Sequence, residues 1–256
     1  MAIKSAYIQE GGNGKLQHEE AMVLSQLKTQ ELPYTLFTLK KMHRRTLKLT
    51  QQDLIVGSIT VIKAAMKQLG IVPPIEDSYP VPLKRYLHRS ISSITLGTLR
   101  SLARDGLDAP LFIKPKSKTK LFAGKVIYTE SDLYSLSHLS AKTNLYCSNV
   151  VSWLSEFRVY VVHGQIRNIS FYEGDARFEL ESDIVEQAVS ELYDSKFGPA
   201  GYALDFGVLA DGRTALIEMN DGFALGAYGV SAKDYTDLIM ARWQELLATI
   251  TAKEMG

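Results

Sequence analysis

The sequence has one cysteine among its 256 residues, and this scarcity removes two classes of protein. A single thiol excludes an internal disulfide framework and a cysteine-rich zinc site. We expect Cys147 to be a small buried side chain, because a free cysteine packs much like other small apolar residues. The five histidines show no H-E-x-x-H spacing, and no G-x-S-x-G motif is present, so zinc and serine hydrolases are not indicated.

An excess of one charge and long apolar runs are also lacking. The 29 Lys and Arg residues nearly balance the 28 Asp and Glu residues, so the net charge of +1 predicts neither nucleic acid nor a membrane surface as partner. No apolar run approaches the roughly 20 residues of a spanning helix, and the first ten residues lack the apolar core of a signal peptide. We therefore expect a cytoplasmic protein, whose 46% hydrophobic content permits one composite domain or several lobes.

The first part of the chain is typical of alternating strands and helices. Apolar spacing predicts strands over residues 5–9, 34–39 and 54–56, and helices over residues 16–28 and 59–69. The chain therefore begins as a β-α-β unit. Four of the eight prolines fall within residues 71–82, which predicts a linker or an irregular crossing. Further helices are expected over residues 83–87, 94–102, 182–193 and 233–250.

A hairpin near the carboxyl end carries the first candidate site. Two apolar runs, residues 202–209 and 214–219, flank an Asp-Gly turn. Asp205 interrupts the first strand, while Glu218 and Asn220 end the second with a spacing of two, which turns both to one face. Strand interiors are poor in such residues, although a surface hairpin with ordinary polar positions is the alternative. Two carboxylates and an amide suit Mg²⁺. Phosphates and water usually complete the coordination shell of this ion.

This arrangement resembles a known family. An aspartate on one strand, Glu-x-Asn closing the next and the glycine-rich segment 222–229 resemble the metal-binding end of ATP-grasp enzymes, most closely the clade named for two arginines and a lysine. The resemblance implies a mixed α/β protein in which antiparallel sheets of two lobes hold ATP with Mg²⁺. It divides the chain into a Rossmann-like pre-ATP-grasp region over 1–75, an amino-terminal lobe over 76–152 and a carboxy-terminal, metal-binding lobe over 153–256.

Residues 111–128 resemble the strand-loop-strand of the amino-terminal lobe. The resemblance assigns Lys114 to the phosphate and adenine edge of the nucleotide, and residues 116–124 to a loop over the phosphates. Lys116 and Lys125 are then expected to bind the nucleotide, and Lys120 to act in catalysis. The loop departs from other branches of the family in lacking several glycines. Five lysines within twelve residues would also suit nucleic acid, but no aromatic residues alternate with them.

The next segment supplies the remaining candidates. Residues 149–153 resemble the linker with which the family holds adenine, so Val151 and Trp153 are expected beside the base. Glu156 and Arg158 share a face at strand spacing, where on a solvated sheet they would form only a weak ion pair. Their place resembles that of the family's phosphate-contacting arginine, which implies catalysis by Arg158, whose planar fork suits the γ-phosphate. Glu156 is assigned to the ribose or to orienting Arg158 or Lys114.

The resemblance implies an ATP-grasp carboxylate–amine ligase. ATP would phosphorylate a small-molecule or peptide carboxylate, and an amine would attack the acyl phosphate to form an amide-like bond, releasing ADP and phosphate. Two alternatives stay open. One is a phosphotransferase of the same fold with a different acceptor, and the other is a nucleotide-binding partner protein without turnover.

Overall fold

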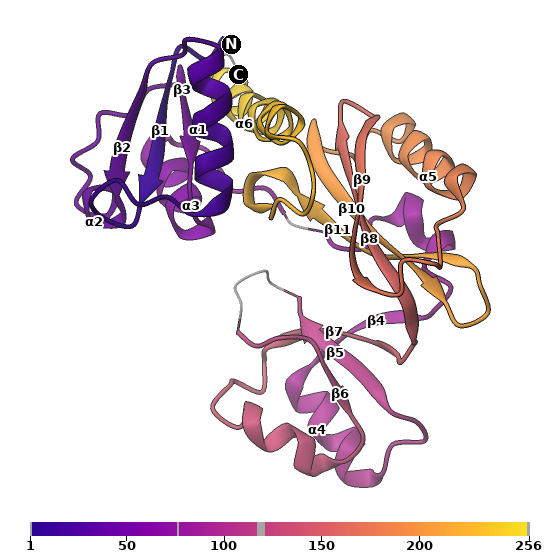
Figure 1. The fold of residues 1–256 in the computed structure, drawn as a ribbon. Coiled ribbons are helices and arrows are strands. Elements are labelled where there is room, and N and C mark those ends of the chain that lie inside the picture. Colours follow the sequence, from indigo (N-terminus) through magenta and orange to yellow (C-terminus); the bar gives the residue numbers. More distant parts are fainter. Residues whose placement is uncertain (1, 76, 117–120, 255–256) are drawn as a thin grey trace. The chain divides into compact units, whose positions relative to one another are not determined.

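The computed structural model describes residues 2–75, 77–116 and 121–254 (Figure 1). The chain forms two compact units. The discontinuous unit combines Met1–Tyr86 with Leu154–Gly256, and the inserted unit is Leu87–Trp153. The three-region division predicted from the sequence stays a prediction. Within the described ranges, no helix combines the length and the apolar character needed to span a bilayer.

The discontinuous unit begins with a three-stranded parallel sheet in the order β2-β1-β3. Its elements are β1 (Ser5–Glu10), α1 (His18–Thr29), β2 (Tyr34–Thr38), α2 (Leu39–His43), β3 (Asp53–Val56) and α3 (Ile59–Leu69). The predicted β-α-β unit is confirmed, because β1 and β2 flank α1 and pair in parallel. The predicted helix over residues 59–69 is confirmed as α3. It ends at Gly70, which takes the left-handed conformation (φ 77°) that favours glycine at this position.

The same unit continues with a four-stranded antiparallel sheet in the order β11-β10-β8-β9. Its elements are β8 (Trp153–Val162), β9 (Gln165–Gly174), α5 (Ser182–Asp194), β10 (Gly201–Leu209), β11 (Thr214–Asp221), the 3₁₀ turn η3 (Gly222–Ala224) and α6 (Ala232–Glu254). The predicted hairpin is β10 and β11. Gly212 makes its turn possible with a φ of 86°, and its N–H donates to the carbonyl of Leu209 at 2.8 Å.

Helix α6 joins the two sheets of the discontinuous unit into one core. Tyr160 and Val162 of the antiparallel sheet belong to the same buried cluster as Ile8 of β1 and Leu238 of α6. The indole Nε1 of Trp243 donates to the main-chain oxygen of Asp53 at 2.8 Å, which ties α6 to β3. These contacts hold the antiparallel sheet and the parallel sheet against α6.

The inserted unit is an antiparallel sheet in the order β4-β7-β5-β6, covered by helical turns. Its elements are β4 (Ile91–Thr95), α4 (Leu96–Asp105), β5 (Leu111–Pro115), β6 (Lys125–Ile127), η2 (Glu130–Leu136) and β7 (Asn144–Asn149). The predicted helix over 94–102 was wrong at its start, because β4 runs to Thr95. Thr95 caps the helix by accepting the N–H of Thr98 at 3.1 Å. Residues 83–87 lie in a 3₁₀ helix, η1 (Val81–Leu87), rather than an α-helix.

The two faces of this sheet differ in character. Ile113 of β5 and Cys147 of β7 pair across the strands and are buried against α4 and η2. The prediction of a buried Cys147 is confirmed. Because side chains alternate along a strand, the neighbouring pair Lys114 and Tyr146 lies on the opposite face.

Candidate functional site

Two carboxylates face each other across the β10–β11 hairpin. Asp205 pairs with Glu218, and the register then shifts so that Phe206 pairs with Leu216, which leaves Ile217 as the extra residue of a bulge. Like charges placed directly opposite in a sheet destabilise it, so this pair requires compensation.

Arg158 of β8 supplies the compensating charge. Its Nε and Nη2 each donate to one carboxylate oxygen of Asp205 at 2.7 Å, and the exposed fractions of the two side chains are 12% and 3%. The Nδ2 of Asn220 donates to Asp205 Oδ2 at 2.9 Å and to Glu218 Oε1 at 3.3 Å. The structure therefore brings Asp205, Glu218 and Asn220 together, as the sequence predicts, and adds Arg158 to them.

Two tyrosines that were not predicted from the sequence lie beside the guanidinium. The Arg158 Cζ lies 4.8 Å from the ring centroid of Tyr228 and 5.9 Å from that of Tyr172, and the two rings stack with centroids 5.6 Å apart. The Tyr172 hydroxyl donates to Glu156 Oε2 at 2.6 Å, so Glu156 lies on the same side of the sheet as Arg158. The position of Tyr228 within the glycine-rich segment was the available sequence signal.

The charged groups at this place shift one another's pKa values. Burial raises the pKa of Glu156, the hydrogen bond from Tyr172 opposes that shift, and the charges of Glu173, Asp205 and Glu218 add to it. Burial alone would lower the pKa of Arg158, but its bonds to Asp205 hold that pKa above its ordinary value, so the guanidinium stays charged. The carboxylates of Asp205 and Glu218 thus lie beside a charged guanidinium, and their oxygens are the kind of ligand that a hard cation prefers.

The donor set matches a magnesium ion better than a metal held entirely by protein. In the part of the chain that the structure describes, no three His, Cys, Asp or Glu side chains are placed together to hold a metal. Asp205 and Glu218 can offer carboxylate oxygens and Asn220 an amide oxygen. Mg²⁺ is commonly bound by one or two carboxylates while phosphate and water complete its octahedral shell, so these residues fit that ion.

The glycine-rich segment after Asn220 is held close to this cluster. A Cβ at Gly222 would lie 2.4 Å from the carbonyl oxygen of Gly201, so glycine is required for this approach. The hydroxyl of Tyr160 donates to the carbonyl of Gly226 at 3.0 Å and accepts the N–H of Tyr228 at 2.6 Å. These bonds fix the position of the Tyr228 ring beside Arg158.

In the inserted unit, two predicted lysines lie together and a third does not. The Nζ atoms of Lys114 and Lys116 lie 5.7 and 5.5 Å from the ring centroid of Tyr146, and Lys116 also donates to Ser93 Oγ at 3.3 Å. Lys125 pairs with Ile113 across the strands, so the two side chains share a face. Ile113 is buried, and its face is the one opposite to that of Lys114.

The partners of Lys125 agree with that placement. Its ammonium donates to the carbonyl of Asp132 at 2.7 Å and to Ser135 Oγ at 3.0 Å, both in η2. The register thus places Lys125 on the face away from Lys114, where it bonds to η2.

The remaining candidates lie in connections. Val151 is half-buried between β7 and β8, and Trp153 begins β8. The guanidinium of Arg89 lies 5.4 Å from the Trp153 ring centroid and donates to the carbonyl of Leu87 at 3.0 Å. Lys120, with residues 117–119 of the predicted phosphate loop, lies outside the described residues.

Comparison with known proteins gives one family and several structural neighbours. The family model that matches describes an ATP-grasp domain, family 2 of the clade named for two arginines and a lysine. The match covers residues 86–238, which is more than half of the chain. No curated protein sequence matches the chain.

Solved structures match over nearly the whole chain. An N5-carboxyaminoimidazole synthetase from Staphylococcus aureus has a TM-score of 0.57 at 12% identity and covers 95% of this chain and 78% of its own. A D-alanine–D-alanine ligase from Bacillus anthracis complexed with ATP has a TM-score of 0.53 at 16% identity, covering 99% and 100%. The macrocyclase MdnC of Microcystis aeruginosa, bound with the precursor peptide MdnA, has a TM-score of 0.51 at 11% identity, covering 84% and 90%. At sequence identities this low, the structural match establishes a shared fold alone.

Proposed function

Because the chain belongs to family 2 of the ATP-grasp clade named for two arginines and a lysine, we propose that it is an ATP-dependent carboxylate–amine ligase. The observation that carries the proposal is the cluster of Arg158, Asp205, Glu218 and Asn220, in which one guanidinium and one amide hold two facing carboxylates. Such a group of fixed opposite charges is what phosphoryl transfer requires, since the protein's contribution to that reaction is mainly positioning and charge stabilisation.

Asp205, Glu218 and Asn220 would hold Mg²⁺. When bound, the ion would neutralise charge on the phosphates of ATP and align them for transfer. The facing positions of Asp205 and Glu218 support this assignment, because a divalent cation held between two carboxylates relieves their mutual repulsion.

Arg158 is proposed to stabilise the phosphoryl group in transfer. Its planar fork holds two oxygens of Asp205, and the same geometry fits two oxygens of a phosphate. The stacked rings of Tyr172 and Tyr228 restrict the guanidinium plane, so little conformational freedom is lost when it changes partner. Glu156 would orient this part of the site or bind the ribose.

The reaction itself has two steps. A carboxylate oxygen of the substrate attacks the γ-phosphorus, the bond to ADP breaks, and an acyl phosphate forms. The amine nitrogen then attacks the carbonyl carbon, the bond from carbon to the phosphate oxygen breaks, and the nitrogen loses a proton. Products are the amide-like compound, ADP and phosphate.

The inserted unit is proposed to contribute contacts to ATP. Lys114 and Lys116 place two ammonium groups around the Tyr146 ring on one face of the sheet, which suits phosphate oxygens. Val151 and Trp153 are proposed to contact adenine, and Lys120 remains a predicted catalytic residue. Lys125 is left out of this proposal, because it lies on the other face and bonds to η2.

The carboxylate is proposed to be that of a small molecule or a peptide. Among the structural neighbours, the D-alanine–D-alanine ligase is named for a small-molecule product and MdnC is bound with a precursor peptide, so the fold accommodates both kinds of ligand.

Hydroxylamine trapping tests the proposed function without knowledge of the amine. The protein, MgCl₂, ATP and hydroxylamine are incubated with pools of amino acids, peptides and small diacids. An acyl phosphate carries an electrophilic carbonyl carbon, so hydroxamate should form in step with ADP. A stable phosphorylated alcohol formed with ADP, and no hydroxamate from the active substrate, would instead identify a phosphotransferase.

A further inference from the structure

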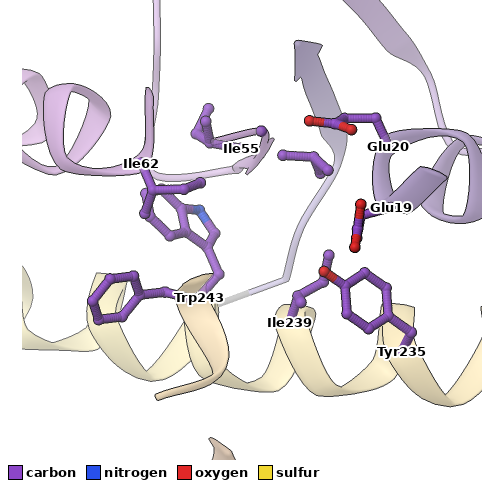
Figure 2. Close-up of a pocket in the computed structure, with 10 residues that line it drawn as sticks. Glu19, Glu20, Ile55, Ile62, Tyr235, Ile239 and Trp243 are labelled. Atoms are coloured by element: carbon purple, nitrogen blue, oxygen red, sulfur yellow. The ribbon is translucent and has the colours of Figure 1, made fainter. Parts of the chain in front are cut away.

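A cavity of about 40 Å³ lies within the discontinuous unit, at the carboxyl end of β3 and beside α1, η3 and α6 (Figure 2). One water requires roughly 10–15 Å³ of such space, so the cavity is large enough for more than one water molecule or for a small ligand. Two side chains with carboxylates, Glu19 and Glu20, line it together with apolar and aromatic residues. The latter include Ile55, Ile62, Phe223, Tyr235, Ile239 and Trp243.

Glu20 is the unusual member of this lining. Its residue is only 6% exposed, and its buried Oε2 accepts no hydrogen bond from the residues that the structure describes. Burial raises the pKa of Glu20, because desolvation disfavours the charged form of its carboxyl. Among the described residues that line the cavity, none carries a positive side chain. A buried carboxylate without a partner is costly, so this oxygen calls for a donor that the described chain does not provide.

Part of Glu20 has an ordinary structural role. It is the third residue of α1, whose N-cap is Gln17, and the backbone N–H groups of Glu20 and Gln17 lower the pKa of its carboxyl. Glutamate and glutamine both serve at this position of a helix. Capping therefore explains the presence of an acceptor at residue 20, but it does not explain the buried second oxygen.

The composition of the lining indicates what the missing donor is. A hard metal ion would need several oxygen ligands and water, whereas most of the lining is aliphatic or aromatic. A primary ammonium group has three donors for carboxylates, is attracted to aromatic faces, and carries an alkyl part suited to isoleucine side chains. Figure 2 shows the Glu19 carboxylate between Glu20 and the ring of Tyr235.

We propose that this cavity binds the primary ammonium group of an aliphatic amine, between Glu20 and Glu19, and that this amine is a substrate of the reaction. The second part rests on the proposed ligase function. It is supported by the link between the cavity and the glycine-rich segment. Glu19 Oε1 accepts the N–H of Ala227 at 3.2 Å, and the Tyr235 hydroxyl donates to the carbonyl of Leu225 at 2.5 Å.

That segment begins two residues after Asn220, and Phe223 within it also lines the cavity. The cavity and the proposed metal ligands are therefore connected through a short stretch of backbone. An amine held by Glu19 and Glu20 would thus contact the segment that positions Tyr228 beside Arg158.

The fluorescence of Trp243 can report whether the cavity is occupied. The chain has two tryptophans, so a Trp153→Phe background leaves the indole of Trp243 as the single tryptophan, in the wall of the cavity. Its fluorescence is titrated with ethylammonium and, as the matched neutral probe, with ethanol, both without nucleotide. Ethylammonium should give a saturable change that ethanol does not reproduce. An equal response to both probes, or a response to neither, would overturn the proposed site.

Glu20→Gln in the same background separates charge from capping. The amide keeps the helix cap, so α-helical circular dichroism should be retained, while affinity for ethylammonium should fall by about tenfold or more. Glu19→Gln serves as the second variant and should also weaken binding. Unchanged affinity in both variants would contradict the site.

Because these titrations contain no ATP, their failure is distinct from failure of the ligase proposal. If ethylammonium binds, its competition against the amine substrate in amide formation tests the second part. Competitive inhibition in the wild type, lost in Glu20→Gln, is expected. Inhibition that is independent of amine concentration would show that the cavity does not receive the substrate amine.

Discussion

Two buried arginine–aspartate pairs hold the same hairpin, and their surroundings differ. Arg242 of α6 bonds to Asp221 at the end of β11 through Nε and Nη2 at 2.7 and 2.6 Å, as Arg158 bonds to Asp205 in β10. Both forks are bidentate and nearly inaccessible to solvent. The chemical pair is therefore the same in the two places.

The difference lies in what surrounds each pair. The Nη1 of Arg242 donates to Glu245 at 2.6 Å, and the same Glu245 oxygen accepts the N–H of Ala200 at 2.8 Å, so this pair is surrounded by further structural hydrogen bonds. At Arg158, by contrast, Asp205 also faces Glu218 across the hairpin and accepts an N–H of Asn220, so this pair lies among the proposed metal ligands. An identical ion pair thus fastens a helix in one place and, in the other, belongs to a cluster suited to a cation and phosphate.

The largest effect is expected from breaking the structural pair. Arg242→Ala leaves Asp221 buried without its counter-charge, which should lower the free energy of unfolding by about 3–5 kcal/mol in urea denaturation. Lys233→Ala, which removes an exposed i,i+4 pair with Asp237, is the control and should not measurably move the midpoint. A loss below about 1 kcal/mol for Arg242→Ala would mean that the pair does not fasten α6.

At the other pair, removal of charge should affect turnover rather than folding. Glu218→Gln keeps the side-chain shape and should reduce ADP formation by about two orders of magnitude or more. Glu173→Gln removes one charge from an exposed neighbouring position and should stay within about twofold of wild type. Equal losses in both variants would reduce the effect to general electrostatics and remove the special role of Glu218.

The geometry of the guanidinium can be tested separately from its charge. Arg158→Lys keeps the charge but loses the fork, so kcat should fall by about tenfold to a hundredfold while nucleotide affinity changes less. Steady-state kinetics and calorimetric titration with a non-hydrolysable ATP analogue give the two quantities. A loss confined to affinity would make Arg158 a binding residue without a role in transfer.

A smaller contrast compares the two faces of the inserted sheet. Lys114→Ala should weaken binding of the ATP analogue by about tenfold, because one charge-assisted contact is lost. Lys125→Ala should leave that affinity unchanged and lower the thermal midpoint, since its partners lie in η2. The reverse pattern would show that the nucleotide uses the face of Lys125.

The sequence predicted best those features that depend on neighbouring residues. The alternation of the hairpin, with its Asp-Gly turn, located β10 to within one residue and turned Glu218 and Asn220 to one face. Helix α3 was bounded by its apolar spacing and Gly70. These patterns act within a few residues, so one sequence suffices to read them.

What the sequence did not predict depends on pairing between distant segments. Arg158 and Asp205 are 47 residues apart, so their bond needs the register of β8 against β10. The face of Lys125 depends on the register of β6, where a slip of one residue would reverse it. The predicted helix began at Ile94, within strand β4 (Ile91–Thr95), because Ile94 continues the apolar spacing of α4. Strand β7 was missed, although Leu145 and Cys147 alternate with polar neighbours.

Binding of Mn²⁺ with ADP, followed by electron paramagnetic resonance, tests the central claim most directly. The claim is that Asp205, Glu218 and Asn220 bind a divalent cation together with nucleotide. Wild-type protein should bind the Mn²⁺·ADP complex, and Glu218→Gln and Asp205→Asn should each weaken it by at least about tenfold, whereas Glu173→Gln should not. Wild-type affinity for Mn²⁺·ADP in both carboxylate variants would contradict the account.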